Sequence, residues 1–135
     1  MISLRSLYNN VGERMKGIGD RLYCQDRPTA VDTRINSYVV ISFPSVIANN
    51  EMDPSGAYND YSTTVLIEVY VRDKMSAKNP VGIDLDAMDE KVSRVMLLLP
   101  YESKGIQVTR PEVVMQSNDG SGFHVTLIRA MLRTK

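Results

Sequence analysis

Residues 61–73 read Tyr-Ser-Thr-Thr-Val-Leu-Ile-Glu-Val-Tyr-Val-Arg-Asp, and their alternation decides the fold. The odd positions are mostly apolar, and the even positions are more polar. Since successive side chains of a β-strand point to opposite faces, this period of two predicts a strand with one buried face. The face that we expect in the core consists of Tyr61, Thr63, Val65, Ile67, Val69 and Val71.

An amphipathic segment follows the strand after a polar break at residues 75–82. Its apolar residues recur at steps of three and four, which is typical of a helix with one buried stripe. Asp84 is placed to cap this helix, and Pro100 to end it. The stripe within residues 84–99 consists of Leu85, Met88, Val92, Val95, Met96 and Leu99.

The rest of the chain predicts one more helix and three more strands. The helix begins at residue 4 and ends between residues 16 and 19, after which Leu22 and Tyr23 form a brief edge pairing. The further strands are expected at residues 38–43, 106–116 and 122–133. Residues 49–60 are rich in turn-forming residues and predict a long loop.

These elements predict a fold of the α+β class, formed by a single domain that spans residues 1–135. The expected order is αββαββ, a four-stranded, mainly antiparallel sheet with two helices on one face. The other face then lacks a cover and is either solvated or buried against another subunit. On the central strand this face consists of Thr64, Leu66, Glu68, Tyr70 and Arg72, which we take as a candidate subunit interface.

Composition excludes several classes of function. The formal net charge is zero, with 16 basic and 16 acidic residues, which disfavours long tracking along nucleic acid. Cys24 is the only cysteine, so neither an intrachain disulfide nor a thiolate metal cluster can form. Residues 1–10 lack the apolar core of a signal peptide, and no apolar run approaches the roughly 20 residues that span a bilayer. We therefore expect folding in a cytoplasm, with no membrane partner.

No group of residues predicts an active site. His124, the only histidine, is expected on an exposed strand position, with no nucleophile or carboxylate motif around it. Cys24 lies in a polar segment without a nucleophile signature. The acidic residues at the start of the second helix complement its dipole instead of forming a cation loop. We expect a protein that is not an enzyme and has no cofactor or metal.

Residues 38–99 resemble the tail-terminator (tail-completion) proteins of long-tailed bacteriophages. The features that carry the resemblance are Ser-Tyr-Val-Val-Ile-Ser at residues 37–42, the long polar loop, the strand at residues 64–72 with its polar break, and the helix with its acidic start. The first helix and the closing strand, residues 123–133, fit the same order. The resemblance implies a structural virion protein, assembled in the host cytoplasm and located in the tail or neck.

The resemblance also implies partners. Tail terminators form hexameric rings that cap the tail tube, end its polymerisation and join the tail to the head connector. Such a homo-hexamer contacts the tail tube protein and the connector or neck protein, with passing contact to genomic double-stranded DNA in the channel. It implies that the long loop docks on the tube or lines the channel, where its acidic residues repel phosphate. The loop residues are Glu51, Met52, Asp53, Tyr58 and Asp60.

Two other functions remain open from the sequence. One is a head–tail connector (neck) protein, which also forms rings. The other is a ferredoxin-like ligand-binding or regulatory domain with no viral role.

Overall fold

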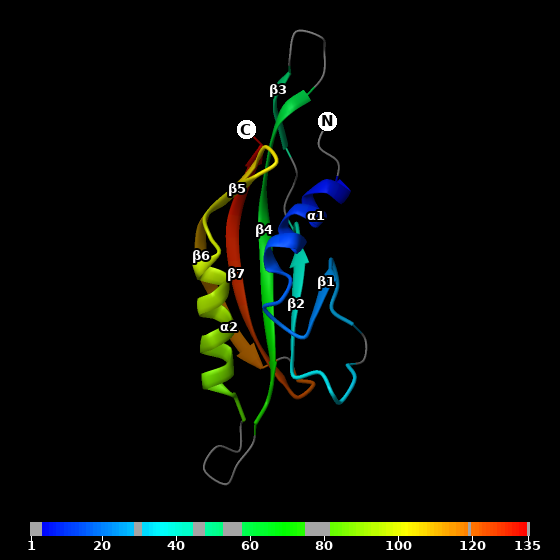
Figure 1. The fold of residues 1–135 in the computed structure, drawn as a ribbon, viewed down its shortest axis with the longest axis vertical. Helices are drawn as coiled ribbons and strands as arrows, with labels where there is room; N and C mark the ends of the chain where they lie inside the picture. The colour runs from blue at the N-terminus through cyan, green and yellow to red at the C-terminus, as the bar shows by residue number, and fades with distance from the viewer. Residues whose placement is uncertain are drawn as a thin grey trace.

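A computed structural model describes residues 4–28, 31–44, 48–52, 58–74, 82–118 and 120–134. These residues form two helices and seven strands, which Figure 1 shows in chain order. The helices and the first four strands are α1 (Leu4–Met15), α2 (Leu85–Leu97), β1 (Arg21–Cys24), β2 (Ser37–Ser42), β3 (Ala48–Met52) and β4 (Tyr58–Arg72). The last three strands are β5 (Tyr101–Ser103), β6 (Ile106–Asn118) and β7 (Phe123–Thr134).

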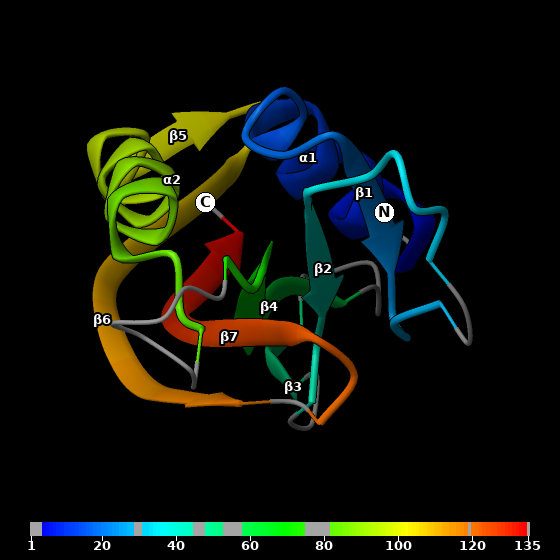
Figure 2. The ribbon, with the colours of Figure 1, turned by 90° about the horizontal axis from the view of Figure 1, so that it is seen from below.

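In the described residues the strands form one mixed sheet in the order β1-β2-β4-β7-β6-β5, and β3 pairs with β4 beside β2. The β1–β2 pair is parallel and all other pairs are antiparallel. The sheet curls strongly into a half-barrel, as the view along the strands shows (Figure 2).

The predicted four-stranded sheet with the order αββαββ is therefore wrong. The sequence predicts a loop at residues 49–60, but β3 and the start of β4 occupy most of that segment. Strand β5 is three residues long, which is too short for a period of two to be visible. The curl and the parallel β1–β2 pair arise from contacts between distant segments, which a local pattern does not encode.

Strand β4 is central and has the buried face that its alternation predicts. Odd positions from Thr63 to Val71 are buried, and Val65, Ile67 and Val69 are fully enclosed. The main core covers this inner face with residues from both helices, including Leu7 and Val11 of α1 and Met88 and Val95 of α2. Both helices thus pack against the concave side of the sheet (Figure 2).

Helix α2 begins where the sequence predicts. The Asp84 side chain caps the helix by accepting a hydrogen bond from the backbone N–H of Ala87 at 3.1 Å. This bond satisfies one of the amides that a helix start leaves without a partner. The helix ends at Leu97, shortly before Pro100.

A second, smaller core lies on the outer face of the sheet. The rings of Tyr38 on β2 and Tyr70 on β4 stack with centroids 4.5 Å apart, and Phe123 of β7 packs edge-on against Tyr38 at 5.2 Å. Ile35, Val40 and Val125 complete the cluster. One end of β4 is therefore buried on both faces.

This second core also explains the pattern of β7. The alternation of β7 changes phase near residues 128–129, yet the strand pairs with β4 in continuous register from Phe123 to Arg133. The strand instead passes from a region covered on both faces to one covered on the inner face. The register shifts lie on β6, between Thr109 and Glu112 and between Val113 and Met115.

Helix α1 closes the open side of the half-barrel. It packs beside β1 and β2, and the Asn10 side chain donates a hydrogen bond to the Ser103 carbonyl of β5 at 3.0 Å. The Tyr101 hydroxyl donates to Asn10 Oδ1 at 2.9 Å, and Arg14 donates to the Leu98 carbonyl. Desolvation of the hydroxyl raises the pKa of Tyr101 to about 12. The helix thereby links the two ends of the sheet.

The β4 alternation predicts unequal effects of truncation on its two faces. Ile67→Ala should lower the free energy of unfolding by about 3 kcal/mol, because it opens a cavity in the main core. Leu66→Ala, the adjacent control on the outer face, should cost less than about 1 kcal/mol in the monomer. Urea unfolding of monomeric protein measures both values. Equal losses would contradict the assignment of the two faces.

Candidate functional site

The five residues of the candidate interface lie on the outer face of β4, but they differ in accessibility. Thr64, Leu66 and Glu68 are partly exposed. Tyr70 is 6% exposed and belongs to the second core, so other side chains of the same protomer cover its ring. The accessible part of the candidate interface is therefore Thr64, Leu66 and Glu68, in the half of β4 nearer the β3–β4 hairpin.

The Arg72 side chain also makes its contacts within the protomer. Its guanidinium donates to the Ile35 carbonyl at 2.7 and 3.0 Å and to the Asp32 carbonyl at 3.2 Å. The guanidinium carbon lies 4.6 Å from the centre of the Phe123 ring. Arg72 thus fastens the segment before β2 over the second core.

On the uncovered part of the outer face, the side chains of β4, β7 and β6 lie in rows, because residues that pair across strands are neighbours. Thr64 lies beside Met131, which lies beside Thr109, and Leu66 lies beside Arg129, which lies beside Glu112. Glu68 lies beside Leu127 in the following row. We call this surface the outer patch, and it consists of Thr64, Leu66, Glu68, Leu127, Arg129 and Met131.

The outer patch mixes apolar and charged groups. Met131 is 48% exposed, and Leu66 and Leu127 are partly exposed. Arg129 donates a hydrogen bond to Glu112 Oε1 from Nε at 2.8 Å and a second one from its terminal nitrogen, an exposed pair that contributes little to stability. Partly exposed apolar groups beside satisfied charges are typical of a surface that contacts another protein.

Glu68 is the titratable group at the centre of this face. Desolvation by its surroundings raises the pKa of the carboxyl above its ordinary value of 4.5, and the positive charge of Arg27 offsets part of that rise. Its neighbours across the strands are Val40 and Leu127, which offer no hydrogen bond from their side chains. Any partner that covered Glu68 further would disfavour its charged form more.

The residues predicted as a tube-facing or lumen-facing loop lie in the β3–β4 hairpin. Glu51 and Met52 belong to β3, and Tyr58 and Asp60 to β4, whereas Asp53 lies outside the described residues. Pairing of β4 with β7 stops at Ser62, so the hairpin continues beyond the sheet as a two-stranded ribbon. Figure 1 shows it projecting at one end of the molecule, past the other strands and both helices.

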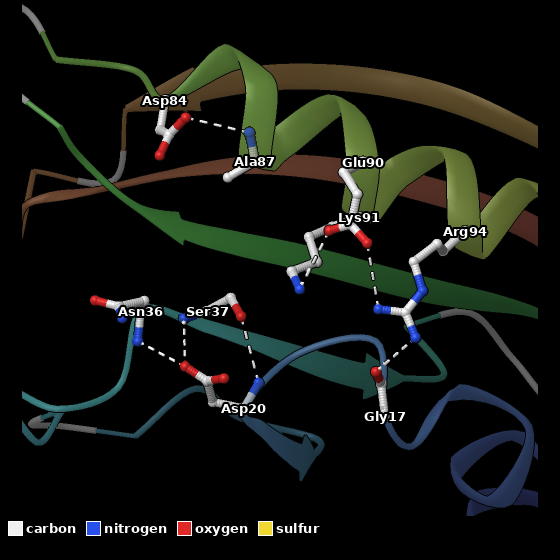
Figure 3. Close-up of polar contacts among 9 residues, drawn as sticks. All are labelled: Gly17, Asp20, Asn36, Ser37, Asp84, Ala87, Glu90, Lys91 and Arg94. Carbon is white, nitrogen blue, oxygen red and sulfur yellow. Dashed lines mark hydrogen bonds and ion pairs between the residues drawn. The ribbon is translucent and has the colours of Figure 1, made fainter.

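A charged cleft of about 370 Å³ lies between α2 and the start of β2 (Figure 3). On the strand side, Asp20 Oδ2 accepts hydrogen bonds from the backbone N–H groups of Asn36 at 2.8 Å and Ser37 at 3.3 Å. The backbone N–H of Asp20 in turn donates to the Ser37 side chain and carbonyl. These bonds fix the turn before β1 against the start of β2.

Charged side chains on the helix side of the cleft are also paired. Glu90 pairs with Lys91 at 3.3 Å and with Arg94 at 3.4 Å, and Arg94 also donates to the Gly17 carbonyl at 2.9 Å (Figure 3). The Arg94 bond joins α2 to the segment after α1. Asp20 and Arg94 therefore hold different segments together, whereas the pairs of Glu90 lie within α2, and no nucleophile is paired with a base among these residues.

His124 is buried, which contradicts the exposed position predicted for it. Its Nδ1 lies 2.5 Å from Asp73 Oδ1, and the side chain of each residue is 10% exposed. His124 shares the inner face with its partner Val71, because Phe123 and Val125 face the second core. The sequence pattern places Phe123 and Val125 in the main core, whereas both pack in the second core on the outer face. The sequence pattern does not reveal that second core. The pair ties the start of β7 to the residue that follows β4.

The described part of the chain holds no group of three or more His, Cys, Asp or Glu residues placed to bind a metal ion. Neither α1 nor α2 is long and apolar enough to span a membrane.

No protein-family model matches this chain, and no curated protein matches it either.

The raised pKa of Glu68 predicts a pH-dependent effect of Glu68→Gln. Between the ordinary and the raised pKa the folded protein holds a proton that the unfolded chain has lost, so this residue lowers stability as the pH rises through that window. At pH 7 the glutamine variant should be more stable, by less than about 1 kcal/mol because solvent screens a half-exposed group. Below the unfolded pKa the difference should vanish.

Glu13→Gln is the matched control for this measurement. The neighbouring Lys16 ammonium, 2.6 Å from the carboxylate, lowers the pKa of Glu13, so removal of its charge should cost stability at neutral pH instead of adding it. Urea unfolding of the two variants at pH 4 and pH 7 measures both differences. A Glu68→Gln variant that is less stable than the wild type at pH 7 would contradict the account of Glu68.

Proposed function

We propose that the chain is a structural protein that assembles into a ring and caps the tail tube of a long-tailed bacteriophage, as tail terminators do. The observation that carries the proposal is the outer patch, a partly apolar sheet face that lies beside a projecting hairpin. The residue pattern described above suggests the family, and the absence of an assembled active site among the described residues is compatible with a structural role. Contact with other subunits is the function that this surface supports best.

A ring requires two different surfaces on each subunit, since a head-to-tail contact closes around an axis only when unlike patches meet. The outer patch lies on the convex side of the sheet, and the β3–β4 hairpin projects from one end. These are two surfaces of different shape and chemistry. The proposed homo-hexamer would place them against each other and leave an end of the ring for the tube protein.

A connector or neck protein remains the second candidate within the same assembly, because it would use the same kind of ring contacts. The ferredoxin-like alternative has lost support. That fold has the order βαββαβ, whereas this chain has four strands between its two helices and three after them in the described residues.

Leu66→Glu tests the proposal, because burial of a new carboxylate at a subunit contact carries a desolvation cost. The variant should remain folded, since Leu66 is partly exposed, but its self-association should weaken by at least about tenfold. Leu97→Glu is the matched control: Leu97 is 84% exposed on α2, away from the outer patch. Light scattering and negative-stain imaging would measure mass and ring formation.

Purified tail tubes provide the second part of the experiment. The wild-type protein should bind tube ends and stop their growth, and Leu66→Glu should do so less. A chain that stays monomeric at high concentration and does not bind tube ends would overturn the terminator proposal. Binding to tailless capsids instead of tubes would favour the connector.

A further inference from the structure

We propose that the β-bulge at Arg110 on β6 is a docking site for the acidic β3–β4 hairpin of a second copy of this chain. The inference deepens the proposed ring, because it names which two surfaces meet. The inference rests on the proposed function only for the closure of the ring, because two copies of the chain could make this contact without forming a ring.

The bulge exposes the positively charged side chain of Arg110. Two residues of β6, Arg110 and Pro111, stand opposite the single Ala130 of β7, because Thr109 pairs with Met131 and Glu112 with Arg129. Arg110 has a φ of 54°, a left-handed conformation that side chains other than glycine rarely adopt. Such strained positions are concentrated at binding and active sites.

Arg110 is exposed and lacks an ionic partner within the described residues. Its Nη1 lies 3.9 Å from the Met131 sulfur, which is a weak acceptor, and no described carboxylate pairs with it. The nearby Arg129 is already paired with Glu112. The guanidinium of Arg110 thus keeps donors for an acceptor other than the described carboxylates, such as one from a second copy.

The surroundings of Arg110 form a shallow depression of about 380 Å³ on the outer face. Met131 contributes a half-exposed apolar wall, and Thr64 of β4 lies at the far side. A ligand that fits this site carries a carboxylate together with an apolar group. Thr64, Arg129 and Met131 of the outer patch line the depression, so its occupant would cover part of that patch.

The hairpin has the complementary chemistry. Residues 48–61 contain three acidic residues and no lysine or arginine, and they include Met52, Tyr58 and Tyr61. The strand register places Glu51 opposite Asp60. Two like charges at a paired position destabilise a ribbon unless a cation meets them.

The described part of the hairpin would also gain stability from a further contact. Beyond Ser62 it consists of two strands alone, and an isolated two-stranded ribbon is marginally stable in water. Docking on a second copy would provide the missing contact. The sequence charge and the geometry therefore point to the same occupant.

The hairpin is expected to dock on the face of the sheet and not to extend its edge. Strand β5 covers β6 only from residue 106 to residue 108, so the rest of that edge is open in the described structure. Pro111 lacks an N–H donor, and two register shifts interrupt the ladder. Such an edge resists the addition of another strand, whereas the side chain of Arg110 remains accessible.

A charge-exchange experiment tests the contact. Arg110→Glu in one chain and Glu51→Lys/Asp60→Lys in another should each weaken self-association about tenfold, because each brings like charges together. All three substitutions in one chain should restore association to within about threefold of the wild type. Association of the wild type should also weaken as ionic strength rises, because the proposed contact is exposed to salt.

Two controls isolate the charge of Arg110. Arg110→Lys keeps the charge and should retain most of the association, which separates the ionic contact from backbone strain at the bulge. Arg34→Glu reverses an exposed charge in the segment before β2, outside the outer patch, and should leave association unchanged, since the Arg34 side chain is 88% exposed and pairs with Asp32. Analytical ultracentrifugation would give the association constants, and unfolding curves would confirm that each variant is folded.

The outcomes separate this inference from the proposed ring. Rings that are unaffected by either charge reversal, or losses that the combined chain does not restore, would overturn the hairpin contact and leave the ring intact. A dimer that follows the charge exchange would uphold the contact and overturn the ring. A wild-type chain that stays monomeric at every concentration would overturn both.

Discussion

The structure depends on the pairing of β4 along both of its edges. One edge carries β2 and β3 in succession, and the other carries β7 in continuous register over Ser62–Arg72 and Phe123–Arg133. Because every second side chain of β4 enters the main core, a slip by one residue would move Val65, Ile67 and Val69 to the outer face. The core beneath the two helices therefore fixes the register, and the register fixes which residues form the outer patch.

The outer face of β4 has two parts with different roles. Around Tyr70 the chain covers itself with stacked rings and with the segment that Arg72 fastens. From Glu68 to Thr64 it leaves a partly apolar surface, next to a hairpin that extends past the sheet. A protomer that completes its own cover at one end and not at the other is suited to assembly with a second copy. In the proposed contact, the acidic hairpin and the exposed cation at Arg110 would give that assembly a direction.

The sequence predicts those elements whose signal is local. The alternation of β4, the cap of α2 and the turn before β7 each lie within a short window, and the structure confirms them, whereas Leu85 of the predicted α2 stripe is 61% exposed. Strand β3 was missed because Asn49, Asn50 and Glu51 favour turns and loops over strands, so its pairing with β4 overrides local preference. The burial of Tyr70 and His124 was missed because it depends on the second core and on Asp73, more than 50 residues away from His124 in the chain. The sequence could therefore place residues 64–72 of the candidate interface on one face of one strand, but which of them remain accessible required the tertiary fold.

Protection of the outer patch on assembly is the central claim, and thiol accessibility tests it most directly. Leu66→Cys introduces a thiol on that patch, and the exposed Cys24 at the end of β1 serves as an internal reference. Alkylation of the introduced thiol should slow at least about tenfold when the protein assembles, as expected for a buried contact, whereas Cys24 should react at an unchanged rate. Equal alkylation of the introduced thiol in monomer and assembly would show that the outer face of β4 is not the surface through which this protein acts.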